Sequence, residues 1–178
     1  ASASLVLDGV SLDGRWVIAQ DAGAFLGRVR PTLLLLQSAL AWGLAESALT
    51  SAHERISGPR TVLKDQAEEL NQMLSRLVTE LRRLAREGVG GDPYGTYRVL
   101  KTRKELAELA VEAVWLELET AGGAGYLSES ETARRLREAA FFPVQSPSFV
   151  QLRSELAQYE ASYGSELAAL AADGEDAS

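Results

Sequence analysis

Few residue types in this sequence are able to do chemistry by themselves. His53 is the single histidine, and there is no cysteine among the 178 residues. These counts exclude a disulfide framework, a thiol nucleophile, a thiolate metal site and a multi-histidine metal cluster. We interpret His53, which falls near a predicted helix end, as structural, and we expect no metal site. Acidic residues are plentiful, but no pair stands out as an acid/base dyad.

The most informative stretch of the chain runs from Glu119 to Arg153. Glycine at a helix end supplies a positive φ and allows close backbone approach, and proline suits a first helical turn. A glycine pair, a Gly-Tyr turn, an arginine-rich segment and two prolines therefore predict helix, turn, helix, break and helix. We interpret the three arginines as a solvated or salt-bridged face. In order, the residues are Gly122, Gly123, Gly125, Tyr126, Arg134, Arg135, Arg137, Pro143 and Pro147.

This order of parts resembles the C-terminal helical-bundle domain of the acyl-CoA dehydrogenase superfamily. In that family a GG-x-GY turn precedes an R-[DE]-A helix, a short loop and a last helix that contains an arginine. The resemblance extends from Val10 to about Tyr159, and upstream Arg55 and Gln66 have the family's eleven-residue spacing. The matching residues of the C-terminal stretch are Gly122, Gly123, Gly125, Tyr126, Arg137, Glu138, Ala139 and Arg153.

The resemblance implies FAD as cofactor and four cofactor-binding residues. Arg55 matches the arginine that reaches the FAD pyrophosphate of a neighbouring subunit, and Gln66 matches a cofactor-contacting glutamine. Gly122 and Gly123 would let the backbone approach the cofactor. A solvated helix-end arginine, a polar residue beside a packing seam and a helix cap explain the same residues equally well. Glu119 replaces the family's glutamine, and its carboxylate would be repelled by a pyrophosphate unless a cation intervened.

The family's catalytic base has no counterpart that we can identify. It is commonly the glutamate of a Glu-Gly-Thr triplet before the last helix, and that triplet falls on Ser146, Pro147 and Ser148. A serine hydroxyl has no accessible anionic form near neutral pH without an activating base. The family's other position for the base corresponds to the purely apolar region around Leu33–Leu36. We therefore expect negligible acyl-CoA dehydrogenation.

Three functions agree with these observations. The chain would be the C-terminal domain of an acyl-CoA-dehydrogenase-like FAD-dependent oxidoreductase, supporting flavin and subunit assembly and inactive alone. It would alternatively belong to one of the superfamily's flavin-dependent monooxygenases, which need no such base. The third hypothesis is a degenerate, non-catalytic assembly subunit. The resemblance also implies a homo-oligomer, dimer or tetramer, formed through bundle helices, and N-terminal and middle domains or a partner subunit.

The predicted fold is mainly α: an antiparallel four-helix bundle with a short N-terminal β segment. Alternating apolar residues over positions 4–20, with a turn at Asp13-Gly14, predict strands. We expect residues 1–22 to be this β segment, the remnant of a middle β-domain, 23–171 to be the bundle and 172–178 to be a disordered acidic tail. Helices are predicted over residues 30–56, 61–86, 94–120, 129–142 and 147–171.

Two helices carry apolar patterns that predict their buried faces. Leu63, Leu70, Leu77 and Leu84 fall seven apart in the second helix, with Ala67, Leu74 and Leu81 between them. This seam favours a bundle helix over a free-standing coiled coil. In the first helix, the apolar stripe that helical spacing predicts is Leu33, Leu36, Leu40, Leu44 and Ala48.

The amino-acid composition limits which partners and which cellular location we expect for this chain. The hydrophobic content of 46% suffices for one domain with a real core, and the net charge of −7 argues against a nucleic-acid partner. The first residues lack the basic and apolar regions of a signal peptide. Polar residues such as Gln37 and Glu46 interrupt the apolar stretch Leu33–Leu49, which predicts a buried core helix and not a membrane span. We therefore expect a cytoplasmic protein.

Overall fold

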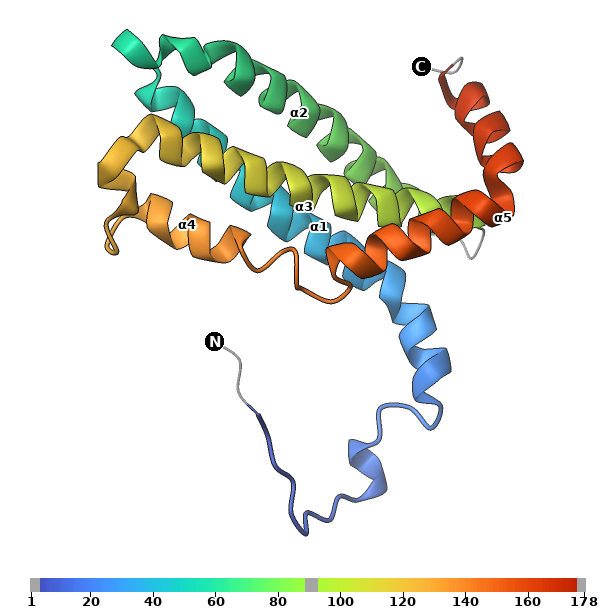
Figure 1. Ribbon diagram of the computed structural model, residues 1–178. Coiled ribbons are helices and arrows are strands. Elements are labelled where there is room, and N and C mark those ends of the chain that lie inside the picture. The colour runs from blue at the N-terminus through green and yellow to red at the C-terminus, as the bar shows by residue number, and fades with distance from the viewer. Residues whose placement is uncertain (1–3, 89–92, 176–178) are drawn as a thin grey trace. The chain divides into compact units, whose positions relative to one another are not determined.

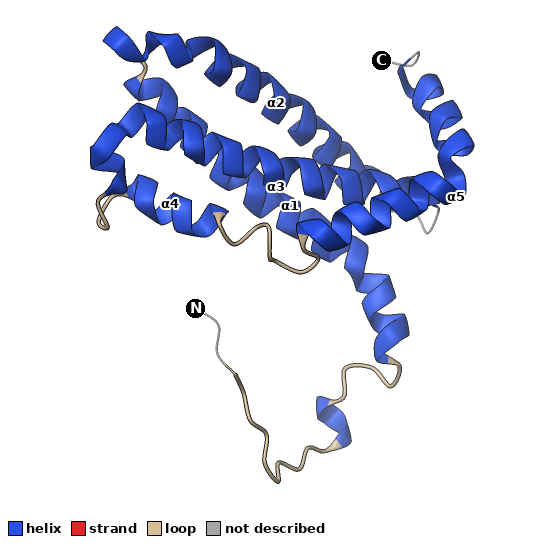
Figure 2. Ribbon diagram, viewed as in Figure 1, coloured by secondary structure: helices blue, strands red, loops and turns tan. Residues whose placement is uncertain are grey.

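The computed structural model describes residues 4–88 and 93–175, with side chains as far as residue 166. These residues are mainly helical (Figures 1 and 2), which confirms the mainly α part of the predicted fold. The α-helices are α1 (Ala22–Arg55), α2 (Lys64–Glu87), α3 (Pro93–Ala121), α4 (Glu131–Ala139) and α5 (Phe149–Glu175). The 3-10 helices are η1 (Gly14–Trp16), η2 (Gly58–Leu63) and η3 (Gly122–Tyr126).

The predicted strands over residues 4–20 are wrong, because no strand occurs in the described part of the chain. Asp13 and Gly14, which we expected in a hairpin turn, instead start η1, where the Asp13 side chain accepts a hydrogen bond from the Arg15 amide at 3.0 Å. Leu5 and Ile18 are 83% and 84% exposed. A hairpin needs a packed face to be stable, and the side chains of this segment have none.

The first long helix begins at Ala22 and not at residue 30, because Asp21 caps it. The Asp21 carboxylate accepts a hydrogen bond from the amide of Ala24 at 3.0 Å. Pro31 consequently lies inside α1 and not in its first turn. The chain divides into two compact units at this proline, residues 1–30 and 31–178, whereas the sequence predicted a boundary after residue 22.

The buried face of α1 consists mostly of alanines together with Leu34 and Leu49, and the first three leucines of the predicted stripe lie outside it. Every alanine of this face is fully buried, whereas Leu33, Leu36 and Leu40 are 49%, 61% and 62% exposed. Small side chains on the buried face allow close helix packing. The predicted stripe is therefore correct at Ala48 and wrong at its first three leucines. The alanines are Ala41, Ala45, Ala48 and Ala52.

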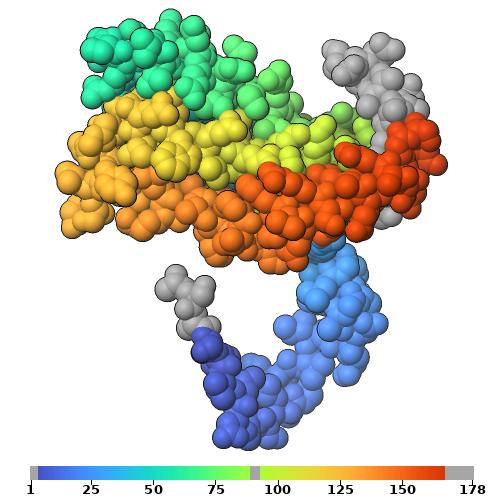
Figure 3. Space-filling model, in the orientation of Figure 1, coloured from blue at the N-terminus to red at the C-terminus, as the bar shows by residue number. Residues whose placement is uncertain are grey.

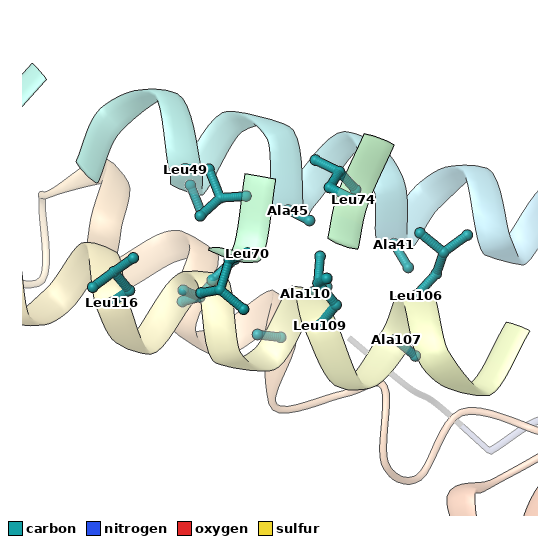
Figure 4. Close-up of a cluster of buried hydrophobic side chains, with 14 of the residues drawn as sticks. Ala41, Ala45, Leu49, Leu70, Leu74, Leu106, Ala107, Leu109, Ala110 and Leu116 are labelled. Carbon is teal, nitrogen blue, oxygen red and sulfur yellow. The ribbon is translucent and has the colours of Figure 1, made fainter. Parts of the chain in front are cut away.

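The leucine seam of α2 packs into the core, as predicted for a helix that contacts other helices. Leu70 and Leu74 join the alanines of α1 and residues such as Leu106 and Leu109 of α3 in one hydrophobic cluster (Figure 4). Each fully buried leucine contributes about 1.5–3 kcal/mol relative to an exposed one. The seam is thus a main source of stability.

Helix α3 is the centre of the helical unit. It contacts α2, α4 and α5, and in Figures 1 and 3 it lies between α2 and α4. Helix α5 packs across the beginning of α3 through a second, smaller cluster. Its buried members are Leu34, Leu84, Val99, Leu100, Leu152 and Leu156.

Several predicted boundaries differ from the observed ones by a few residues. Helix α4 is shorter than predicted, and α5 continues to Glu175, past the predicted end at 171. The last three residues of the predicted tail, 176–178, lie outside the described residues. Gly88 ends α2 with a φ of 74°, and residues 89–92 of the predicted loop are likewise outside the described part.

Among the described helices, α1 has the length and the apolar composition that would allow it to cross a membrane. In its most apolar stretch of 18 residues, 39% of the residues are buried inside the fold. Core helices of soluble proteins share this property, so it does not assign a location.

Candidate functional site

A tight turn places α4 beside the end of α3. Gly125 in η3 sits so close to α3 that an added Cβ would lie 2.7 Å from the Cβ of Ala121. Ser130 then caps α4: its hydroxyl accepts a hydrogen bond from the Ala133 amide at 3.0 Å and donates one to the Gly125 carbonyl at 2.7 Å. The turn therefore sends α4 back along α3, so that side chains of the two helices meet.

The meeting point is a buried ion pair between Glu117 of α3 and Arg135 of α4. Arg135 Nε donates to Glu117 Oε2 at 2.7 Å, and Arg135 Nη2 donates to Oε1 at 2.5 Å. Oε1 also accepts hydrogen bonds from Thr132 Oγ1 at 2.7 Å and from Ser51 Oγ at 3.0 Å. The Glu117 side chain is fully buried. One carboxylate thus joins α1, α3 and α4.

These contacts determine the charge state of Glu117. Burial raises the pKa of this carboxyl, but hydrogen bonds from Arg135, Thr132 and Ser51 and the Arg135 charge outweigh burial and hold the pKa below its ordinary value. Hydrogen bonding to Glu117 raises the pKa of Arg135. A carboxylate whose oxygens accept four hydrogen bonds has little basicity left, so Glu117 is a structural anion and not a general base.

Arg55, one of the four predicted cofactor-binding residues, belongs to this network. Its Nη1 donates to the Ser51 carbonyl at 3.0 Å and to the Ser51 hydroxyl, and it lies 3.6 Å from Glu117 Oε1. The side chain is 38% exposed. Arg55 is therefore held by internal partners and still reaches solvent at the end of α1.

The other three predicted cofactor-binding residues lie on the surface. Gly122 has a φ of 63° directly after α3, the conformation that ends a helix, and both Gly122 and Gly123 are exposed. Gln66 is exposed in the first turn of α2 and takes no part in the Glu117 network. The glycine pair thus follows the end of α3, the helix that carries Glu117, and Gln66 lies outside the Glu117 network.

Ser146, at the position of the family's base, lies in the segment between α4 and α5. Its residue is exposed, and its carbonyl accepts a hydrogen bond from Gln37 Nε2 at 2.9 Å. The neighbouring Gln145 accepts a hydrogen bond from the Arg103 guanidinium. The single histidine of the sequence, His53, is exposed at the end of α1. The described surroundings of Ser146 supply no group that would activate its hydroxyl.

The arginines of α4 occupy two different environments. Arg134 is exposed and pairs with Glu131 and Glu138, each at 2.6 Å, and Arg137 is exposed, as predicted for a solvated or salt-bridged face. Arg135 is salt-bridged, as that prediction allows, but it is buried against Glu117 and does not belong to an exposed face. Among residues 4–88 and 93–175, no group of three or more acidic or histidine side chains is arranged to hold a metal ion.

The exposed leucines of α1 form a separate surface feature, the leucine face, defined as Leu33, Leu36 and Leu40. The face continues along α1 to Gly43 and Ser47, which line a cleft of about 220 Å³ with Arg134 and Glu138 of α4. Its residues repeat at three- and four-residue intervals, the spacing of a helix-packing seam.

Sequence reasoning missed Glu117 and Arg135, although a signal was present. Glu117 follows Ala113 and Val114 at helical spacing, so a carboxylate occupies a position that the apolar pattern assigns to the core. A buried carboxylate requires a cationic partner. With several arginines available, the sequence offered no means of choosing Arg135.

Comparison with known proteins found no match to a protein-family model, to a curated protein or to a solved structure.

Proposed function

We propose that this chain is a helical assembly domain that associates with a second copy of itself through the leucine face of α1. The observation that carries this proposal is the exposure of Leu36 and Leu40, 61% and 62%, in the middle of a helix whose opposite side is fully buried. Contiguous exposed apolar side chains on a folded surface mark interaction sites. Gly43 and Ser47, at the continuation of the face, leave room for close approach of a second helix.

The proposed architecture is the antiparallel four-helix bundle of the acyl-CoA-dehydrogenase-like type. Support comes from the four long helices. Helix α3 contacts both α2 and α5, and α1 contributes residues to the hydrophobic core that α2 and α3 share. In bundles of this kind, residues on the outward side of a core helix are free to form contacts between subunits.

A catalytic role for the chain alone has less support. Glu117, the fully buried carboxylate of the Glu117 network, is committed to Arg135 and two hydroxyls. The proposal therefore follows the assembly hypothesis and expects no acyl-CoA dehydrogenation, a reaction that needs a positioned base.

Flavin support is the second candidate function, and one observation favours it. Arg55 keeps 38% of its side chain exposed at the end of α1 while it lies 3.6 Å from Glu117 of α3, and the exposed Gly122 and Gly123 follow the end of α3. A partly exposed guanidinium is a suitable group for binding a pyrophosphate. In this reading an oxidoreductase or monooxygenase would use the domain to hold FAD, with a β-domain supplied by another part of the assembly.

Sedimentation velocity tests the assembly proposal. The wild-type chain is expected to sediment as a dimer or larger species, and the double variant Leu36→Glu/Leu40→Glu as a monomer with an unchanged helical circular dichroism spectrum. Val62→Glu is the matched control, because Val62 is 83% exposed but belongs to η2. A wild-type monomer at high concentration, or dissociation by the control, would contradict the proposal.

FAD titration separates the two candidate functions. Flavin support predicts quenching of FAD fluorescence by the wild-type chain and its loss in Arg55→Met, while Arg60→Met, an exposed arginine of η2, keeps it. If neither the wild-type chain nor Arg55→Met changes the fluorescence, only the assembly function remains supported.

A separate experiment tests the expectation that the chain does not dehydrogenate acyl-CoA. Rapid flavin reduction on anaerobic mixing of an FAD-loaded homo-oligomer with acyl-CoA thioesters would refute the expectation based on Ser146.

A further inference from the structure

A second buried arginine has no carboxylate partner. Arg103 of α3 is fully buried. Its Nε donates to the side-chain oxygen of Gln37 at 3.3 Å, and its Nη2 donates to that of Gln145 at 2.9 Å. Nη1 is buried and has no hydrogen-bond partner among the described protein atoms. Two neutral amide oxygens are therefore the acceptors that hold this cation.

The buried Arg135 and the half-buried Arg98 are paired with carboxylates, although Nη2 of Arg98 also has no hydrogen-bond partner among the described protein atoms. Arg135 is paired with Glu117, and Arg98 lies 2.7 Å from a carboxylate oxygen of Glu80. No described acidic side chain forms such a pair with Arg103. Burial lowers the pKa of Arg103. Burying a cation without a counter-charge is unfavourable, so a negative charge supplied at Nη1 would be strongly favourable.

The surroundings of Arg103 are suited to one small anion. The Phe142 ring lies 5.7 Å from its Cζ, and Gln37 and Gln145 fix its other edges. The two outer nitrogens of a guanidinium form a fork that matches the two oxygens of a carboxylate. Gln145 is half-buried in the segment between α4 and α5, which has turns but no regular helix, so a local opening there gives access from solvent.

We propose that Arg103, with Gln37 and Gln145, forms a binding site for a single small carboxylate anion. The site lies where α3 meets Gln37 of α1 and Gln145 of the segment between α4 and α5, and it differs from the Glu117 network at the other end of α3. It does not depend on the leucine face or on flavin. The carboxylate would accept hydrogen bonds from Nη1 and the free N–H of Nη2, and Phe142 would border its apolar side.

Formate titration of the full chain tests the site. The folding equilibrium constant is measured by urea denaturation at constant ionic strength while sodium gluconate, whose carboxylate is too bulky to enter, is replaced by sodium formate. For the wild-type chain the constant is expected to rise about tenfold when formate reaches about ten times its dissociation constant. Sodium chloride forms a separate arm, and a smaller response to chloride than to formate is expected.

Gln145→Glu supplies the missing charge within the protein. Because the carboxylate replaces an amide 2.9 Å from Nη2, its folding constant in gluconate is expected to rise about tenfold, and its formate response to disappear. Gln72→Glu is the matched control: the residue is exposed on α2, so it adds the same charge and keeps the wild-type response. Arg103→Met is also expected to lose the response.

Three results would overturn the proposal. The first is a wild-type folding constant that is the same in formate and in gluconate. The second is a rise of the folding constant with formate that is as large in Gln145→Glu as in Gln72→Glu. The third is a rise of the wild-type folding constant that is equally large with chloride and with formate. The last would show a site for any small anion and not for a carboxylate. Gln145→Glu keeps the test valid even if Arg103→Met does not fold.

Discussion

At the scale of single residues, the stability of the helical unit depends strongly on Glu117. Removing its charge by Glu117→Gln leaves Arg135 buried without compensation, which is expected to lower the free energy of unfolding by about 3 kcal/mol or more. Glu119→Gln, two residues further along α3 and exposed, is the control and is expected to change it by less than about 0.5 kcal/mol. Urea denaturation of both variants measures the difference. Equal stabilities would show that the ion pair is energetically neutral.

The same residue predicts a pH dependence. The folded-state pKa of Glu117 lies below its ordinary value of 4.5, so the folded state binds its proton less readily than the unfolded chain. Its contribution is therefore complete above the ordinary pKa and is lost as the pH falls through the folded-state pKa. The stability difference between the wild-type chain and Glu117→Gln is expected to shrink below about pH 4.5, as measured by urea denaturation over an acid pH series. A difference that stays constant through this range would contradict the assignment.

At this scale, the sequence correctly predicted a helix end, but it did not predict which side chains pair with each other. The glycine pair correctly predicted the end of α3, because helix capping depends on neighbouring residues only. The partners of the Glu117 side chain lie in two other helices, α1 and α4, with Ser51 separated by 66 positions. Such contacts depend on the packing of whole helices, which the local pattern does not contain.

At the scale of elements, the position of α4 depends on the missing side chain of Gly125. In Gly125→Ala the new Cβ would meet Ala121 at 2.7 Å and Thr132 Cγ2 at 3.2 Å, so α4 must shift away from α3. We expect a loss of about 1–3 kcal/mol in unfolding free energy. Gly123→Ala is the matched control, because its Cβ would enter open space and its φ is not positive. Denaturation curves that coincide for the two variants would contradict this explanation of the turn.

The predicted buried faces of α1 and α2 show when the spacing of apolar residues identifies the wrong side of a helix. The seam of α2 was correct because every large apolar residue in that helix falls on one side. In α1 the leucines are divided: Leu34 and Leu49 are buried, whereas Leu36 and Leu40 are exposed, and the predicted stripe followed the exposed set. The contribution of an apolar residue to a core depends on how closely its helix approaches a neighbour, and alanine allows the closest approach without glycine's flexibility.

At the scale of the whole molecule, Pro31 separates a segment that the helical unit does not require. Every buried residue of α1 lies after this proline, beginning with Leu34. A chain of residues 31–178 is expected to keep its helical circular dichroism per residue and a melting temperature within a few degrees of the full chain. Pro31 would then occupy the first helical turn, a favourable position for proline. A loss of cooperative melting would show that residues 1–30 contribute to folding.

The helical class of the molecule could be predicted because five separate segments carried helical patterns and only one carried an alternating pattern. The alternating segment was misassigned because strand formation requires a neighbouring strand or a packed face, and neither is encoded in the segment itself. Function was less accessible, since a family-like order of glycines and arginines is also the order that capping and ion pairing produce in any helical domain.

The extended segment before η1 has a consequence for handling the protein. Leu5, Val6 and Leu7 are adjacent β-forming residues that expose 83%, 85% and 69% of their surface, and no backbone ladder occupies them. Such a sequence is a template for intermolecular cross-β stacking, held in check by the neighbouring Asp8 and Gly9. Although the described residues contain no strand, we expect intermolecular strand formation at this segment to limit the solubility of the protein. Amyloid-type deposits in concentrated stocks would grow from this end, while the helices remain intact.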